Sequence, residues 1–157
     1  RETEQFRNEL LDIGISQMSA GSSVGVGGYA KRQTVDEDGT DEKPQFNLAD
    51  HRKPVDVLKG LVKDGYVPSY CTACYRLGRT GDRFMPLAKS GEISNFCLPN
   101  ALLTFEEYLQ DYGDEELKES GREMIKSEIE KIPNVKRREK AAEYLDRIGN
   151  GERDLRF

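Results

Sequence analysis

Three cysteines stand at a spacing that suits a metal centre, and they are all the cysteines in the chain. Two residues separate Cys71 from Cys74, and 22 residues separate Cys74 from Cys97. A tight turn can point two thiolates at i and i+3 toward one centre, and a distant third cysteine then closes the loop over it. The residue types and their spacing therefore predict metal binding.

Redox and disulfide uses of cysteine explain the pattern less well, whereas structural zinc remains an alternative. A redox pair of Cys71 and Cys74 would open a helix in a thioredoxin-like βαβ unit, which the sequence lacks. A secreted disulfide framework would leave one of three cysteines unpaired. Structural zinc could use the three cysteines with His51, the single histidine, as its fourth ligand. Spacing alone does not decide between zinc and an iron-sulfur cluster, although a lone histidine beside a helix start is more often hydrogen-bonded than ligating.

The number of cysteines carries a further message for an iron-sulfur site. A four-iron four-sulfur (4Fe-4S) cluster needs one ligand per iron, so three cysteines leave one iron able to take an exogenous ligand. Clusters that only transfer electrons are usually fully ligated. An open iron instead indicates a reactive or carrier cluster.

Composition excludes several classes of function. The 157 residues have a net charge of −5, and 34% of them are charged. A net acidic chain argues against nucleic acid, because neutralising a phosphate backbone needs a concentrated basic surface. No apolar run approaches the roughly 20 residues that cross a bilayer, and the first residues have no apolar signal core. We therefore expect no membrane function, and free thiols fit a cytoplasmic protein.

The beginning of the chain predicts a helix over residues 4–11 and a short strand over residues 12–18. One helix and one strand cannot bury themselves, so we interpret them as the last unit of a larger parallel α/β barrel or sheet. The glycine-rich and serine-rich segment of residues 19–29 is either a substrate-side loop or a flexible linker. We place the domain boundary between residues 1–30 and 31–157.

The remainder predicts a mostly α fold, α+β if the strand is counted. Helices are expected over residues 54–62 and 82–89, ended by Gly65 and Gly91. Thr104 and Glu107 have the form of a capping box that would start another helix. Two apolar stripes with helical spacing follow the capping box, and we expect both to be core: Leu117, Met124, Ile125, Ile129 and Ile132, then Val135, Ala141, Ala142, Leu145 and Ile148.

Three segments together resemble a known family. They are residues 71–81 (CTACYRLGRTG), residues 95–109 (NFCLPNALLTFEEYL) and residues 150–155 (NGERDL). These resemble the C-terminal domain of the HydG family, the radical SAM tyrosine lyases that mature iron-iron hydrogenase. The resemblance covers nearly the whole chain.

The resemblance implies a function and a set of cofactors. The family's full-length enzyme is a TIM barrel that cleaves tyrosine with S-adenosyl-L-methionine (SAM) and a 4Fe-4S cluster, and makes carbon monoxide and cyanide. An auxiliary 4Fe-4S cluster in the C-terminal domain, here on Cys71, Cys74 and Cys97, carries an extra iron held through free cysteine. It exports an iron carbonyl cyanide unit to hydrogenase maturation proteins and the H-cluster. Ser19 and Ser22 would border the tyrosine pocket.

The sequence also departs from the family. The Cys-x3-Cys-x2-Cys motif of the SAM cluster is absent, and so are most barrel strands, so we do not expect this chain alone to be active. The family's histidine ligand of the extra iron belongs to the missing barrel. His51 therefore does not inherit that role.

Overall fold

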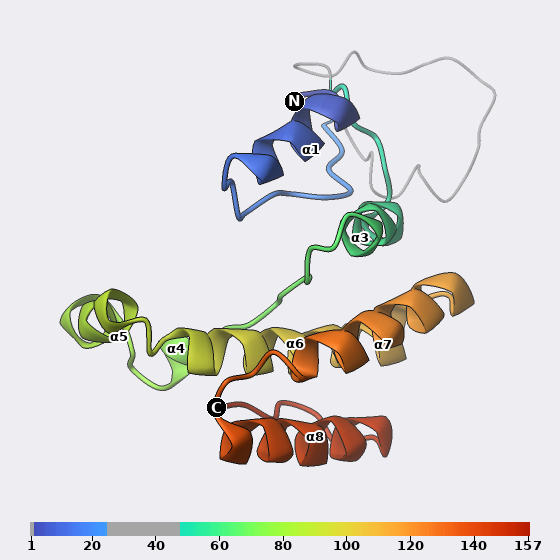
Figure 1. The fold of residues 1–157 in the computed structure, drawn as a ribbon. Helices are drawn as coiled ribbons and strands as arrows, with labels where there is room; N and C mark the ends of the chain where they lie inside the picture. Colours follow the sequence, from blue (N-terminus) through green and yellow to red (C-terminus); the bar gives the residue numbers. More distant parts are fainter. Residues whose placement is uncertain (1, 25–47) are drawn as a thin grey trace. The chain divides into compact units, whose positions relative to one another are not determined.

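The computed structural model describes residues 2–24 and 48–157, and within these ranges every regular element is a helix (Figure 1). The chain divides into two compact units, Arg1–Val57 and Leu58–Phe157. The predicted boundary after residue 30 falls outside the described residues and stays a prediction. The helices are α1 (Glu4–Asp12), α3 (Pro54–Lys63), α4 (Ala73–Arg76), the 3-10 helix η1 (Gly81–Arg83), α5 (Phe84–Ser90), α6 (Ser94–Tyr112), α7 (Glu115–Ile129) and α8 (Val135–Gly149).

The first helix forms as predicted, but the strand after it does not. The Thr3 side chain caps α1 by accepting a hydrogen bond from the Phe6 amide, and Gly14 ends the helix with a φ of +95°. The described residues after Gly14 have no regular structure up to residue 20. A strand needs a neighbour to pair its backbone groups, and the described residues contain no other strand. The barrel unit is therefore not seen in this chain.

A buried ion cluster holds the first unit together. The Asp50 carboxylate is 4% exposed and pairs with the guanidinium groups of Arg7 and Arg52. The side-chain hydrogen bond from Arg52 is the main reason that the pKa of Asp50 lies well below its usual range. Arg7 also donates to the carbonyl of Ser19. The cluster thus links α1, the segment at Ser19 and the segment that leads into α3.

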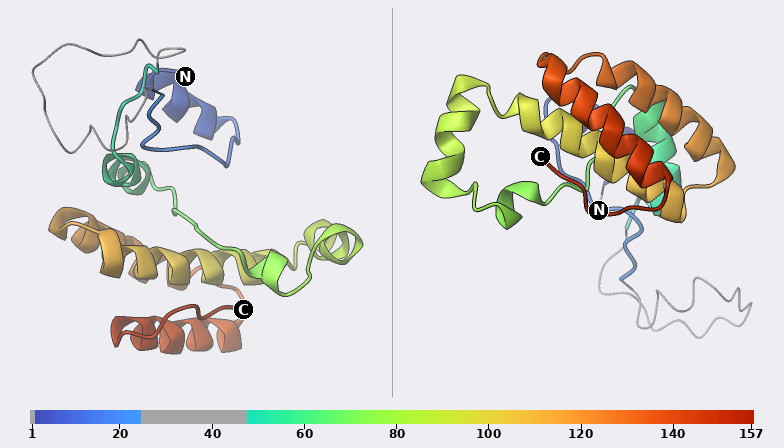
Figure 2. Two further views of the ribbon diagram at one scale, coloured as in Figure 1. Left: turned by 180° about the vertical axis from the view of Figure 1, so that it is seen from behind. Right: turned by 90° about the horizontal axis from the view of Figure 1, so that it is seen from below.

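In the second unit, α6 packs against both α7 and α8 (Figures 1 and 2). The apolar faces of the three helices meet in one core, which confirms most of the two predicted stripes. Val135 and Ala142 were expected in this core, but both are exposed. The largest fully buried side chains are Phe105, Leu102, Leu103, Leu109, Leu117, Ile132, Ile148 and Pro99.

Gly121 sets how closely α7 approaches α6. A Cβ atom at this position would lie 2.8 Å from Leu109 Cδ1 and 3.0 Å from Phe105 Cζ. Those distances are shorter than van der Waals contact, and both neighbours are fully buried. The α7 backbone therefore lies directly against two core side chains of α6.

The helix that carries Cys97 starts ten residues earlier than predicted. α6 begins at Ser94, so Thr104 lies in its middle and the predicted capping box is wrong. Pro99 has no amide to donate to the carbonyl of Asn95 one turn earlier, which would normally break a helix here. Arg137 of α8 supplies the missing donor, with its Nη1 atom 3.2 Å from that carbonyl oxygen. A contact from outside the helix thus supports the turn around Cys97.

Candidate metal centre

Cys71 and Cys74 lie on a tight turn that leads into a single turn of helix. The Cys71 sulfur accepts a hydrogen bond from the Ala73 amide, with an N···S distance of 3.4 Å. Cys74 lies inside α4, and its carbonyl accepts from the Arg79 amide at 2.8 Å. Gly78, with a φ of +66°, allows the chain to reverse between Cys74 and Arg79. The hydrogen bond from Ala73 therefore restrains the direction of the Cys71 sulfur.

The middle of α6 holds the residue before Cys71. The Tyr70 amide donates to the Thr104 hydroxyl at 3.2 Å, and the Tyr70 ring stacks on Tyr108 with ring centres 5.0 Å apart. The Thr104 hydroxyl in turn donates to the Asn100 carbonyl at 2.9 Å. The start of the cysteine turn is therefore fixed to the helix that carries Cys97.

The three thiols lie within electrostatic reach of one another. Cys97 lies in the first turn of α6. Partial burial raises the pKa of the Cys97 thiol, and the neighbouring Cys74 and Cys71 raise it further, whereas Arg79 lowers it. All three cysteines are free of disulfides. Their role as ligands stays a prediction.

Arg79 is a candidate functional residue that sequence reasoning missed. Its guanidinium lies over the Phe96 ring, 4.4 Å from the ring centre, and its Nη2 atom donates to the Phe157 carbonyl at 2.6 Å. Its Nε atom is buried and has no hydrogen-bond partner among the described residues. Arg79 is one arginine among several near the cysteine motif, so only the folded structure distinguishes it.

The structure does not support the zinc alternative. Among residues 2–24 and 48–157, no group of three or more His, Cys, Asp or Glu side chains is placed to hold a single metal ion. A 4Fe-4S cluster attaches each thiolate to a different iron and so spans a wider set of sulfurs than one ion does. The donor chemistry fits such a cluster: three thiols, an amide on one sulfur and a buried guanidinium donor nearby.

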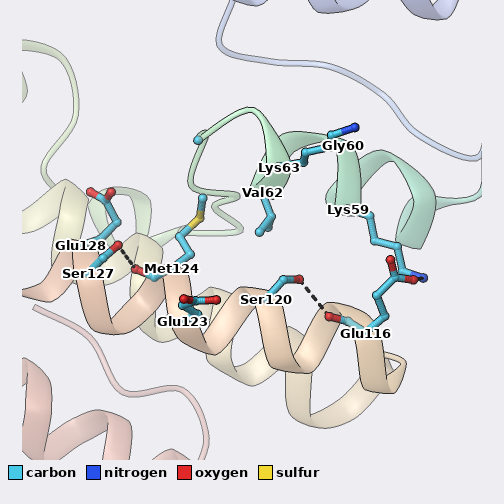
Figure 3. Close-up of a pocket in the computed structure, with 11 residues that line it drawn as sticks. Lys59, Gly60, Val62, Lys63, Glu116, Ser120, Glu123, Met124, Ser127 and Glu128 are labelled. Atoms are coloured by element: carbon cyan, nitrogen blue, oxygen red, sulfur yellow. Dashed lines mark hydrogen bonds and ion pairs between the residues drawn. The ribbon is translucent and has the colours of Figure 1, made fainter.

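A pocket of the second unit lies away from the cysteines. It has a volume of about 670 Å³ and is formed by α3 and α7 (Figure 3). Val62 and Met124 give it an apolar floor, and Lys59, Glu116 and Glu123 give it a charged rim. None of the cysteines lines it, so it is not part of the candidate metal centre.

Ser19 and Ser22, the predicted substrate-side residues, lie in the first unit. Ser19 is exposed and its carbonyl accepts from Arg7, while Ser22 is half-buried. Neither lies in the unit that holds the cysteines. Their role beside a tyrosine pocket stays a prediction.

Comparison with known structures identifies the chain's relatives. No protein-family model matches the chain, and no curated protein is similar enough to it to count as a match. A crystal structure of HydG, described as a maturase of the FeFe-hydrogenase, matches all of this chain with 55% sequence identity and a TM-score of 0.88. The chain is homologous to the C-terminal part of HydG. It spans 32% of the HydG chain.

The similarity to HydG agrees with the mostly helical fold of the described residues. It also agrees with the three segments on which the sequence resemblance to the HydG family rested, two of which carry the cysteines. None of the helices in the described residues is long and apolar enough to cross a membrane.

Proposed function

We propose that this chain is the auxiliary iron-sulfur domain of a cytoplasmic radical SAM tyrosine lyase that matures iron-iron hydrogenase. The observation that carries the proposal is the 55% sequence identity to HydG over the whole of this chain, in which Cys74 and Cys71 lie close enough to Cys97 to raise the pKa of its thiol. The three thiolates would hold a 4Fe-4S cluster, and free cysteine would hold an additional iron on the open position. Such a cluster supplies an iron site that exchanges its ligands.

The protein around the centre supports this assignment by fixing its ligands. The Ala73 amide keeps the Cys71 sulfur in place, and Thr104 fixes the backbone one residue earlier. Arg137 supports the turn of α6 that carries Cys97. Because hydrogen bonds to ligand residues and their backbone orient the ligands, the chain provides a defined frame rather than three independent thiols.

We further propose that residues 1–30 complete a TIM barrel contributed by the rest of the protein. The first unit leaves large apolar side chains in solvent: Phe6 is 46% exposed, Ile13 77% and Ile15 46%. α1 has no buried residue. Apolar residues exposed together need a covering surface, and neighbouring barrel strands would provide it. That barrel would bind SAM and tyrosine, produce carbon monoxide and cyanide, and place Ser19 and Ser22 near the substrate.

Metal analysis after anaerobic reconstitution tests the central claim. The expected result is about four irons with matching sulfide per chain, and visible charge-transfer absorption. Cys97→Ser should lower the iron content and the absorption, whereas the neighbouring Ser94→Ala, which removes a hydroxyl bonded only to the Gly91 carbonyl, should retain both. One tightly bound zinc without visible absorption would contradict the proposal. Iron content that is unchanged in Cys97→Ser would remove Cys97 from the ligand set.

A further inference from the structure

The Arg79 side chain presents a buried donor that nothing in the described residues satisfies. Its Nε atom is buried without a hydrogen-bond partner, and it is the only buried side-chain nitrogen or oxygen in the described residues of which this is true. Leaving a buried donor unpaired costs free energy, so native structures rarely do it without a functional reason. An unpaired cationic donor near three cysteines indicates that an acceptor belongs there.

The orientation of this guanidinium is set by three contacts around it. The Arg79 amide donates to the Cys74 carbonyl at 2.8 Å, so the residue is fixed to the cysteine turn. Its plane lies over Phe96, the neighbour of Cys97, and its Nη2 atom is bonded to the Phe157 carbonyl. The backbone of Arg79, its guanidinium plane and one of its terminal nitrogens are all held by these contacts. The direction of the Nε–H bond is therefore fixed as well.

Arg79 differs from the neighbouring Arg76 in having no Asp or Glu partner among the described residues. Among the ion pairs of residues 2–24 and 48–157, the nearby Arg76 pairs with Asp154, but no acidic side chain pairs with Arg79.

We propose that Arg79 is a positioning residue of the metal centre, which donates its Nε–H to a sulfide of the iron-sulfur cluster held by Cys71, Cys74 and Cys97 and favours the reduced cluster. This rests on the proposed function. Reduction by one electron, supplied in the test by dithionite, adds one negative charge to the cluster and breaks no bond. A fixed positive donor stabilises the more negative state, as hydrogen bonds to cluster sulfurs generally do.

Redox titration of the reconstituted chain, followed by paramagnetic resonance, measures this effect without any assay of activity. Arg79→Gln should lower the midpoint potential by at least about 59 mV. For a one-electron couple this shift is a tenfold change in the ratio of reduced to oxidised cluster. Arg79→Lys keeps the charge but loses the planar donor, and should give a smaller shift in the same direction.

Arg76→Gln is the matched control. Arg76, the last residue of α4, lies beside the cysteine turn as Arg79 does, but its guanidinium is exposed and pairs with the Asp154 carboxylate. The control should keep a midpoint close to that of the parent, because it removes an arginine near the cysteines without removing the unpaired donor. Iron and sulfide content is measured in every sample.

Several results would overturn the proposal. An unchanged midpoint in a fully loaded Arg79→Gln variant would do so. Equal shifts in Arg79→Gln and Arg76→Gln would also do so, because the effect would then come from the loss of any positive charge near the cysteines. Loss of iron from both Arg79 variants, with the control loaded, would mean that Arg79 holds the loop instead. A shift seen only after adding free cysteine would place the acceptor on the exogenous ligand. A parent without iron would refute the proposed function itself.

Discussion

Replacement of Gly121 by alanine should destabilise the second unit, although alanine is the better helix former. In an open helix interior the change from glycine to alanine stabilises by about 1 kcal/mol. At this position the new methyl group would lie 2.8 Å and 3.0 Å from the two Cδ atoms of Leu109 and 3.0 Å from Phe105 Cζ. Both side chains are 0% exposed, so neither can move into solvent to make room.

The net effect follows from these two opposing contributions. Overpacking in a closed core costs about 1–3 kcal/mol. Subtracting the gain in helix propensity leaves a loss of up to about 2 kcal/mol in the free energy of unfolding. The last residue of α8 provides a matched control, because a Cβ atom at Gly149 would meet nothing within 4 Å. Gly149→Ala should stabilise by about 0.4–1 kcal/mol.

Urea unfolding followed by circular dichroism measures both variants. A third variant, Leu109→Ala, should cost about 2–5 kcal/mol alone because it opens a cavity. In that background the methyl group of Gly121→Ala enters space that Leu109 has left, so the added cost should shrink or change sign. If Gly121→Ala proves as stable as Gly149→Ala, α7 does not approach α6 as closely as described.

Three further predictions concern the ion cluster and the metal centre. Asp50→Asn should lose about 3 kcal/mol, because it leaves Arg7 and Arg52 without their buried partner. The pKa of Asp50 is lower in the folded protein than in the unfolded chain. The difference in the free energy of unfolding between the parent and Asp50→Asn should therefore be full above the usual carboxyl pKa of 3.8 and shrink as the pH falls below it. Removing the metal should speed hydrogen exchange over residues 70–79 but not in α7; equal protection with and without metal would contradict this. Added cysteine or cyanide should change the resonance spectrum of the reduced cluster equally in parent and His51→Ala; a response only in the variant would make His51 the fourth ligand.

Local sequence signals predicted the helices well because each had a physical start or stop. Gly91 ends α5 with a φ of +77°, which suits glycine in particular. The apolar stripes of α7 and α8 could be recognised because a surface helix must bury one face. Val135 was misplaced because it begins α8, where an apolar residue at the first turn can remain outside the core.

The features that failed depend on contacts between distant parts of the chain. The strand over residues 12–18 needs a partner strand, which the described residues do not contain. The start of α6 was missed because Pro99 indicates a helix break, and the compensating donor comes from Arg137, 42 residues after the carbonyl it satisfies. Arg79 was missed because charge patterning cannot show which arginine has a buried, unpaired nitrogen.

The proline within α6 has a consequence for the order in which the metal centre takes shape. The turn that carries Cys97 is completed by Arg137, and a contact across 42 residues forms only after the intervening α7 and the start of α8 have folded. Thiol labelling during refolding would report when each cysteine becomes protected. We expect the turn with Cys71 and Cys74 to form from local contacts, and the third sulfur to reach its final direction only when α8 has packed.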